Sequence, residues 1–138
     1  MAYLSQQALA DRFGTYELEQ LAPDGSGGID PTKINAAIAD AGNEIDIYLT
    51  SGGYPLPLTP VPPVIEAYAC DVARYRLYDD EATEQVNKRY EQALKFLKAV
   101  AKGEIRLSAN HQDLSSSNEA VGEAVFVSNR PTFPGGSF

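Results

Sequence analysis

A loop with the residue types of a calcium site occurs early in the chain, within LAPDGSGGIDPTKI, residues 21–34. If Ile29 takes the hydrophobic eighth position of an EF-hand loop, the oxygen-ligand positions are filled by Asp24, Ser26 and Asp30. Ala22 and Lys33 then stand at the first and twelfth positions, where such a loop needs an aspartate and a glutamate. Because Lys33 adds a positive charge in place of two ligand oxygens, we expect this loop to bind no metal.

The same residues contain the signals that start a helix. Asp30 has a side chain suited to the N-cap, and Pro31 fits the first helical position, where its missing N–H costs nothing. Ile29 and Ile34 have the spacing of a hydrophobic staple around that cap. The sequence therefore predicts a tight glycine turn followed by a helix that begins at Asp30.

Groups that could act in catalysis are few. Cys70 and His111 are the only cysteine and histidine, and together they could form a nucleophile–base pair. However, Cys70 stands among Ala69, Val72 and Ala73 in a helical pattern, which favours a small buried side chain. The sequence contains no glycine-rich phosphate loop, metal-ligand spacing or nucleophile elbow. We expect a protein that is not an enzyme and uses no cofactor.

Charged residues around position 75 allow two further interpretations. Arg74 and Arg76 alternate with Tyr75 and Tyr78, a pattern that can bind nucleic acid. Acidic residues close on both sides, Asp71 among them, favour ion pairs between packed helices instead. The acids that follow are Asp79, Asp80, Glu81 and Glu84. These acids could imitate a carboxylate metal cluster, but the dipole at a helix start accounts for them.

Apolar residues at helical spacing define the elements that carry these groups. A short helix over residues 6–14 is expected with Ser5 as its cap, and residues 15–21 continue for a turn or two. Longer helices are expected from Asp30 to about residue 50, from Pro62 or Pro63 to about residue 78, and from about Glu81 to Lys102. The sequence therefore predicts a mainly α fold, a small bundle of about four helices.

Two segments lie outside these helices. Residues 51–63 are rich in proline and glycine, so we expect an extended connection whose Tyr54, Leu56 and Leu58 partly contact the core. Residues 108–138 begin small and polar and then contain short β-prone pieces. We therefore divide the chain into a helical domain, residues 1–107, and an extended C-terminal arm, residues 108–138. The arm carries three of the five phenylalanines, Phe126, Phe133 and Phe138, which we expect to contact a partner.

The composition excludes several classes of protein. No apolar run reaches the roughly 18 residues of a membrane helix, and the N-terminus has no pattern of a secretion signal. The net charge is −8, with eight acidic and two basic residues in positions 1–60. This balance disfavours sequence-independent binding to DNA phosphates, although an acidic surface lets DNA slide past without sticking. A lone cysteine fits a reducing cytoplasm.

Taken together, these segments resemble a family of structural proteins from Mu-like phages and prophages. The resemblance rests on ALADRFG, DGSGGID, YPLPLTPVPP and CDVARYRLYDD, followed by V.KRYEQALKFL, which occur in this order between about residues 3 and 107. The remaining chain matches only loosely, in a short piece that contains RPTF. The acidic loop has fewer aspartates than the family pattern, which further weakens a metal site.

That family is similar to the small helical head–tail connectors of long-tailed phages. The resemblance implies a helical bundle that assembles as a ring, commonly a dodecamer, beneath the portal. Its partners would be further copies of itself, the portal protein and the next neck or tail-completion protein. Phage DNA would pass through the lumen without specific binding, and no membrane would be contacted. The implied location is the virion neck, after assembly in the host cytoplasm.

A second hypothesis belongs to a different class of protein. The chain could be a small monomeric binding or regulatory module with a degenerate EF-hand-like loop at Asp24, Ser26 and Asp30. The mass of the protein in solution separates the two hypotheses, because a neck adaptor forms rings or assembles on the portal and a regulatory module stays monomeric.

Overall fold

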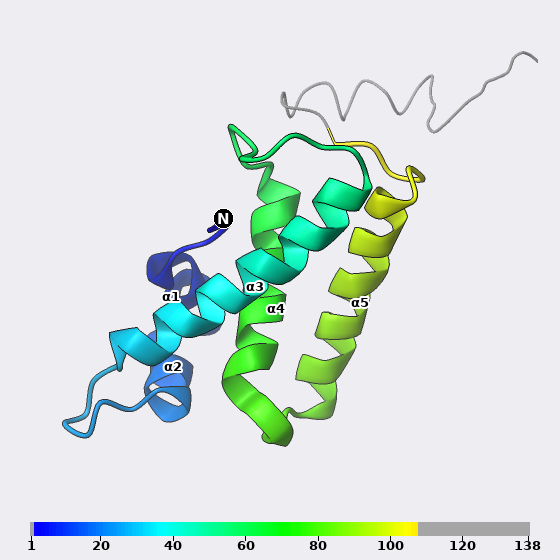
Figure 1. Cartoon of the computed structure of the whole chain (residues 1–138). Coiled ribbons are helices and arrows are strands. Elements are labelled where there is room, and N and C mark those ends of the chain that lie inside the picture. The colour runs from blue at the N-terminus through cyan, green and yellow to red at the C-terminus, as the bar shows by residue number, and fades with distance from the viewer. Residues whose placement is uncertain (1, 108–138) are drawn as a thin grey trace, which may run out of the picture.

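The computed structural model describes residues 2–107, within which the chain forms five α-helices and one short 3-10 helix. The elements are α1 (Gln6–Phe13), α2 (Thr15–Leu21), α3 (Pro31–Ser51), α4 (Pro63–Tyr78), η1 (Asp79–Glu81) and α5 (Glu84–Ala101). In Figure 1, α3 crosses α4 obliquely, α5 runs beside α4, and the short α1 and α2 lie at the other side. The predicted mainly α bundle is confirmed for this part of the chain, and residues 15–21 form a full helix.

The core lies between the three long helices. Large side chains with no solvent exposure come from every helix except η1: Leu9, Leu18, Ile34, Ile45, Leu49, Ile65, Val72, Leu97 and Val100. On α3, α4 and α5 they follow the helical stripes expected from the sequence. Burial of each such side chain contributes roughly 1.5–3 kcal/mol, so these stripes supply most of the drive to fold.

The start of α3 agrees with the prediction from sequence. Asp30 has an extended backbone, and its Oδ1 accepts a hydrogen bond from the Thr32 N–H at 3.0 Å. Pro31 occupies the first helical position, as expected. The loop before it therefore leads directly into the longest helix of the bundle.

Replacement of Asp30 by alanine is expected to lower the free energy of unfolding by about 1 kcal/mol, because the Thr32 N–H loses its acceptor. Urea denaturation monitored by circular dichroism measures this change. Asp30→Ser is the matched control, since serine keeps an N-cap oxygen and should change stability by only a few tenths of a kcal/mol. An Asp30→Ala midpoint equal to that of the unaltered chain would contradict this account of the helix start.

The start of α5 differs from the prediction. The helix was expected from about Glu81, but Asp79–Glu81 form η1 and α5 begins at Glu84. Thr83 is the N-cap, and its Oγ1 accepts a hydrogen bond from the Val86 N–H at 3.2 Å. Asp79 has a positive φ of 55°, which ends α4 sharply. The helix therefore begins after the Thr83 hydroxyl cap and not at the run of acids.

The proline-rich connection closes one end of the bundle. Residues 54–62 contain no helix, and Tyr54, Leu56 and Leu58 pack partly buried against the core, as predicted. The connection lies at the same end of the bundle as the C-terminus of α5 (Figure 1). The Leu107 N–H donates a hydrogen bond to the Tyr54 hydroxyl at 2.7 Å, which ties the two segments together.

The arm predicted for residues 108–138, with its β-prone pieces and phenylalanines, lies outside the described residues. The boundary between the two predicted domains, at residue 107, therefore stays a prediction.

Candidate interaction surface

Asp24 organises the loop that resembles a calcium site. Its Oδ1 accepts hydrogen bonds from the Ser26 N–H at 2.7 Å, the Gly28 N–H at 2.9 Å and the Ser26 hydroxyl at 3.0 Å. These donors, the Ser26 N–H first, hold the pKa of Asp24 below its ordinary value. A Cβ on Gly28 would lie 2.6 Å from the Asp24 Oδ2, so a larger residue there would push the carboxylate out of these hydrogen bonds, and the positive φ of Gly25 and Gly27, 89° and 88°, is the conformation that favours glycine.

The ends of the loop are also joined by internal hydrogen bonds. The Asp30 N–H donates to the Ala22 carbonyl oxygen at 2.7 Å, and the Lys33 ammonium donates to the Leu21 carbonyl oxygen at 2.8 Å. The three candidate ligands therefore shape the turn and cap α3. Between residues 2 and 107, no three His, Cys, Asp or Glu side chains gather closely enough to hold a metal ion.

Calcium is expected to leave the thermal stability of the protein unchanged. Lys33 stands at the twelfth loop position, where a calcium site needs a bidentate carboxylate, and its ammonium donates to the Leu21 carbonyl oxygen. A ligand that binds the native state raises stability by mass action, so differential scanning calorimetry with and without millimolar calcium is the measurement. A rise of several degrees in Tm that magnesium and matched ionic strength do not reproduce would contradict this prediction.

Arg74 joins α4 to the short N-terminal helices. Its Nε and Nη2 donate to the two carboxylate oxygens of Glu17 at 2.6 and 3.0 Å, and its guanidinium lies 4.2 Å from the ring centroid of Phe13. The side chains of Arg74 and Glu17 are only 12% and 21% exposed. Ion pairing between packed helices was predicted for this stretch, but the partner lies on α2 rather than among the neighbouring acids.

Arg76 and Tyr90 share a carboxylate on α3. The Arg76 Nη2 and the Tyr90 hydroxyl donate to the two oxygens of Glu44 at 2.5 and 2.8 Å. The Tyr90 ring stacks on Tyr75 with centroids 3.8 Å apart. Burial, followed by the hydrogen bond to Glu44, raises the pKa of Tyr90 to about 12. Arg74, Arg76 and Tyr75 therefore make contacts between helices, as the ion-pair interpretation predicted.

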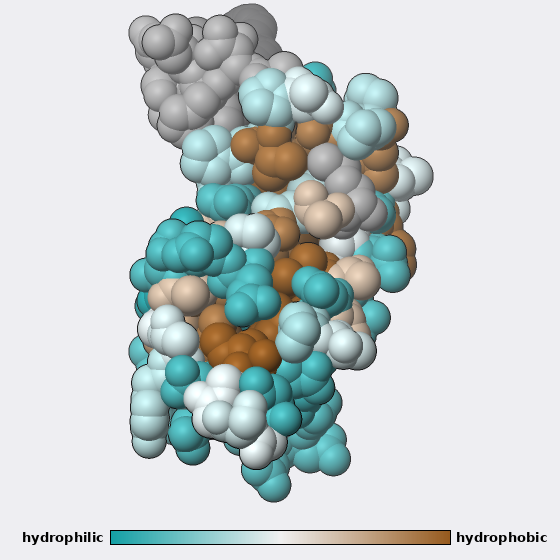
Figure 2. Space-filling view, turned by 90° about the vertical axis from the view of Figure 1, so that its left-hand side faces the viewer, coloured by the Kyte–Doolittle hydropathy of each residue, from teal (hydrophilic) through white to brown (hydrophobic). Residues whose placement is uncertain are grey.

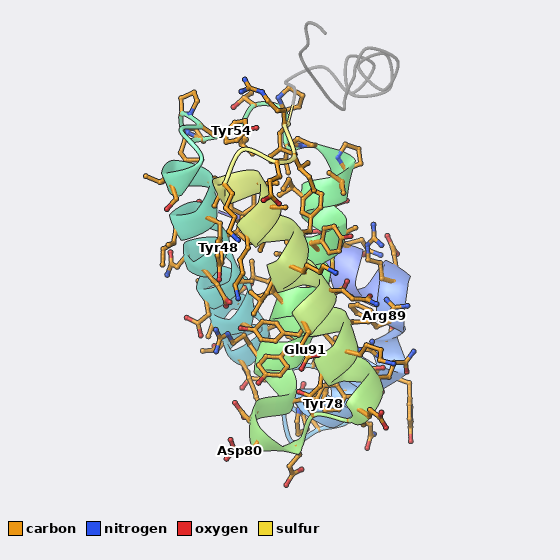
Figure 3. The ribbon with its side chains drawn as sticks, turned by 90° about the vertical axis from the view of Figure 1, so that its right-hand side faces the viewer. Tyr48, Tyr54, Tyr78, Asp80, Arg89 and Glu91 are labelled. Carbon is orange, nitrogen blue, oxygen red and sulfur yellow. The ribbon has the colours of Figure 1, made fainter. Side chains whose placement is uncertain are left out.

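The remaining candidate groups are separated from one another. Cys70 is fully buried, and burial raises the pKa of its thiol to about 11, so it stays protonated at neutral pH. His111, its candidate partner, lies outside the described residues, as do Phe126, Phe133 and Phe138. The acids of η1, Asp79–Glu81, are exposed at the end of the bundle opposite Tyr54 (Figure 3).

Two of the hollows on the described part of the chain could receive another molecule. One of about 450 Å³ is lined by Arg12, Phe13, Arg74, Gln85 and Arg89. In Figure 3, Arg89 points toward the side that carries α1 and α2. The other, of about 230 Å³, lies in the proline-rich connection beside Tyr54 and Leu107. Cationic side chains line the first hollow and proline and apolar side chains line the second, so both are candidate docking sites.

Apolar side chains also reach the surface away from these hollows. Tyr16 on α2 is 74% exposed and Ile47 on α3 is 66% exposed. Figure 2 shows that polar groups frame a central apolar area on the face formed largely by α1, α2 and the start of α3. None of the helices in the described part is both long and apolar enough to cross a membrane.

Comparison with known proteins assigns this helical chain to a family. The family described as "Bacteriophage Mu, Gp36" has a model that matches residues 3–125, which include every helix described above. The chain belongs to this family. The resemblance to proteins of Mu-like phages and prophages, inferred from the quoted segments, is thereby confirmed.

Two related phage and prophage proteins match this chain over most of their own length. The Mu-like prophage FluMu protein gp36 of Haemophilus influenzae is 38% identical over 127 residues, which cover 89% of each chain. Gene product J of Escherichia phage Mu is 31% identical over 105 residues, 75% of this chain and 74% of its own. Membership in the Gp36 family points to a structural or morphogenesis role in a phage.

Proposed function

We propose that this member of the Gp36 family is a structural protein of the phage neck, a head–tail connector that assembles as a ring beneath the portal. The observation that carries the proposal is the family match over residues 3–125, which spans the whole helical bundle. The proposed partners are further copies of the chain, the portal protein and the next neck or tail-completion protein. The proposed location is the neck of the virion, after assembly in the host cytoplasm.

Ion pairs between the helices and the net negative charge support this proposal. Arg74, Arg76 and Arg89 each pair with an acid on another helix, namely Glu17, Glu44 and Asp71. Such contacts make a stiff unit, which suits a part that must keep its shape inside a larger assembly. The net charge of −8 also suits a lumen through which DNA slides, because the 19 acidic residues outnumber the 11 Lys and Arg residues and repel phosphates.

The mass of the full-length protein in solution tests the proposal. Size-exclusion chromatography with light scattering, followed by negative-stain microscopy, should reveal rings of several copies, either alone or after addition of the portal protein. A protein that stays monomeric in both cases would overturn the ring. If its Tm also rose with calcium, the monomeric module with an EF-hand-like loop would replace the connector.

A further inference from the structure

The hollow in the proline-rich connection has the size and the lining of a site for one aromatic ring. Its volume is about 230 Å³, and its walls include Tyr54, Pro57, Leu58, Pro60, Pro62 and Leu107. An apolar cavity of about 150 Å³ is already sufficient to hold benzene. We call this site the proline groove.

The proline groove is held in shape by the rest of the bundle. The Tyr54 N–H donates to the Leu49 carbonyl oxygen at 3.0 Å, and the Tyr54 hydroxyl accepts from the Leu107 N–H at 2.7 Å. Figure 3 shows Tyr54 at this end of the molecule, above α5. Prolines in the wall have a fixed φ, so little backbone freedom remains to be lost when a ligand docks.

The sequence offers an aromatic occupant for this groove. Leu107 is part of the groove wall, and the residues that follow it, 108–138, contain Phe126, Phe133 and Phe138. Phe133 stands between Pro131 and Pro134 in the sequence. We propose that the C-terminal segment of a second copy of this chain docks in the proline groove, with Phe133 as its anchor. This inference rests on the proposed ring assembly.

The length of the segment allows it to reach a neighbouring copy. An extended chain spans at most about 3.3–3.6 Å per residue, so Phe133 can lie on the order of 90 Å from Leu107. A domain of about 100 residues has a radius of gyration of only about 13 Å. The groove of an adjacent subunit is therefore well within reach.

Exchange between copies is favoured over return to the same chain. Inside a ring, the other contacts between subunits already hold the groove of the next copy close to the segment, so docking there costs about as little loop-closure entropy as return does and also links two copies. In a ring, every copy gives one segment and receives one, so the same head-to-tail contact repeats until the ring closes. The other contacts between subunits then reinforce the docking of each phenylalanine.

Site-specific crosslinking of full-length protein tests the inference. One variant carries Thr59→Cys in the groove lining and the other carries Thr132→Cys beside the Phe133 anchor, and the two are mixed, assembled and treated with a short bismaleimide. The native Cys70 is fully buried and should not react. A covalent dimer of the two variants is expected. Tyr16→Cys replaces Thr59→Cys as the control, because Tyr16 is 74% exposed on α2, and should give at least tenfold less dimer.

The other outcomes overturn the inference. If a chain that carries both cysteines crosslinks only within itself, the segment returns to its own groove. If the Tyr16→Cys control crosslinks equally well, the contact is not specific to the groove. Negative-stain microscopy of the same samples separates this failure from that of the proposed function: rings without the crosslink overturn only the docking, whereas absence of both rings and crosslink overturns both.

Discussion

Replacement of Arg74 by alanine should lower the free energy of unfolding by about 2–3 kcal/mol. The Glu17 carboxylate then loses the two hydrogen bonds that it accepts from the guanidinium. The Glu17 side chain is only 21% exposed, so water replaces these donors poorly. The replacement also removes the cation that lies over the Phe13 ring. Because these contacts fasten α1 and α2 to α4, the loss should be concentrated in the N-terminal helices.

Urea denaturation measures this loss, and Arg76→Ala is its matched control. Arg76 also pairs with a glutamate, but its side chain is 41% exposed, so its removal should cost about 1 kcal/mol or less. A double-mutant cycle with Glu17→Gln should give a coupling energy of about 1–2 kcal/mol. Equal effects of Arg74→Ala and Arg76→Ala would show that burial does not strengthen the Arg74 pair.

Deletion of residues 120–138 is expected to abolish ring assembly and to leave the helical bundle folded. Within residues 2–107 the buried core cluster runs from Tyr3 to Val100, so the described helices already bury one another's apolar side chains. Burial of each phenylalanine is worth roughly 1.5–3 kcal/mol, which is close to the entropy cost of ordering the segment in an isolated chain. In an assembly, a groove on another subunit buries the phenylalanines, so docking of the segment becomes favourable.

Circular dichroism measures whether the truncated bundle is folded, and light scattering measures whether it assembles. A full-length variant with Phe126, Phe133 and Phe138 changed to serine is the matched control, because it keeps the length of the segment and loses only its aromatic rings. If the truncated protein unfolds, the segment belongs to the core of its own domain. If it forms rings as the full chain does, the segment has no part in assembly.

Local signals made the helix starts near Ser5 and Asp30 predictable. In both cases a side-chain oxygen accepts a backbone N–H within three residues, a contact that sequence spacing alone specifies. The start of α5 was misplaced because the acids at 79–81 match the helix dipole as well as Thr83 matches a cap. Only the folded backbone distinguishes these two choices.

Contacts between residues far apart in the sequence could not be predicted from local sequence patterns. Arg74 and Glu17 are 57 residues apart, and nothing in their surroundings marks them as partners. Tyr3 is 2% exposed, and its hydroxyl donates to Asp46, although its place at the N-terminus suggests an exposed residue. The proline groove likewise depends on Leu107 meeting Tyr54, a contact across 53 residues. Proline content predicted the extended connection but not the hollow within it.

Electron cryomicroscopy of the neck of phage particles that carry this chain is the most direct test of its proposed role. We expect a closed ring between portal and tail into which copies of the α3–α5 bundle fit, with density from each subunit entering the proline groove of the next. A neck fully accounted for by other proteins, with this chain absent from the particle, would contradict this expectation.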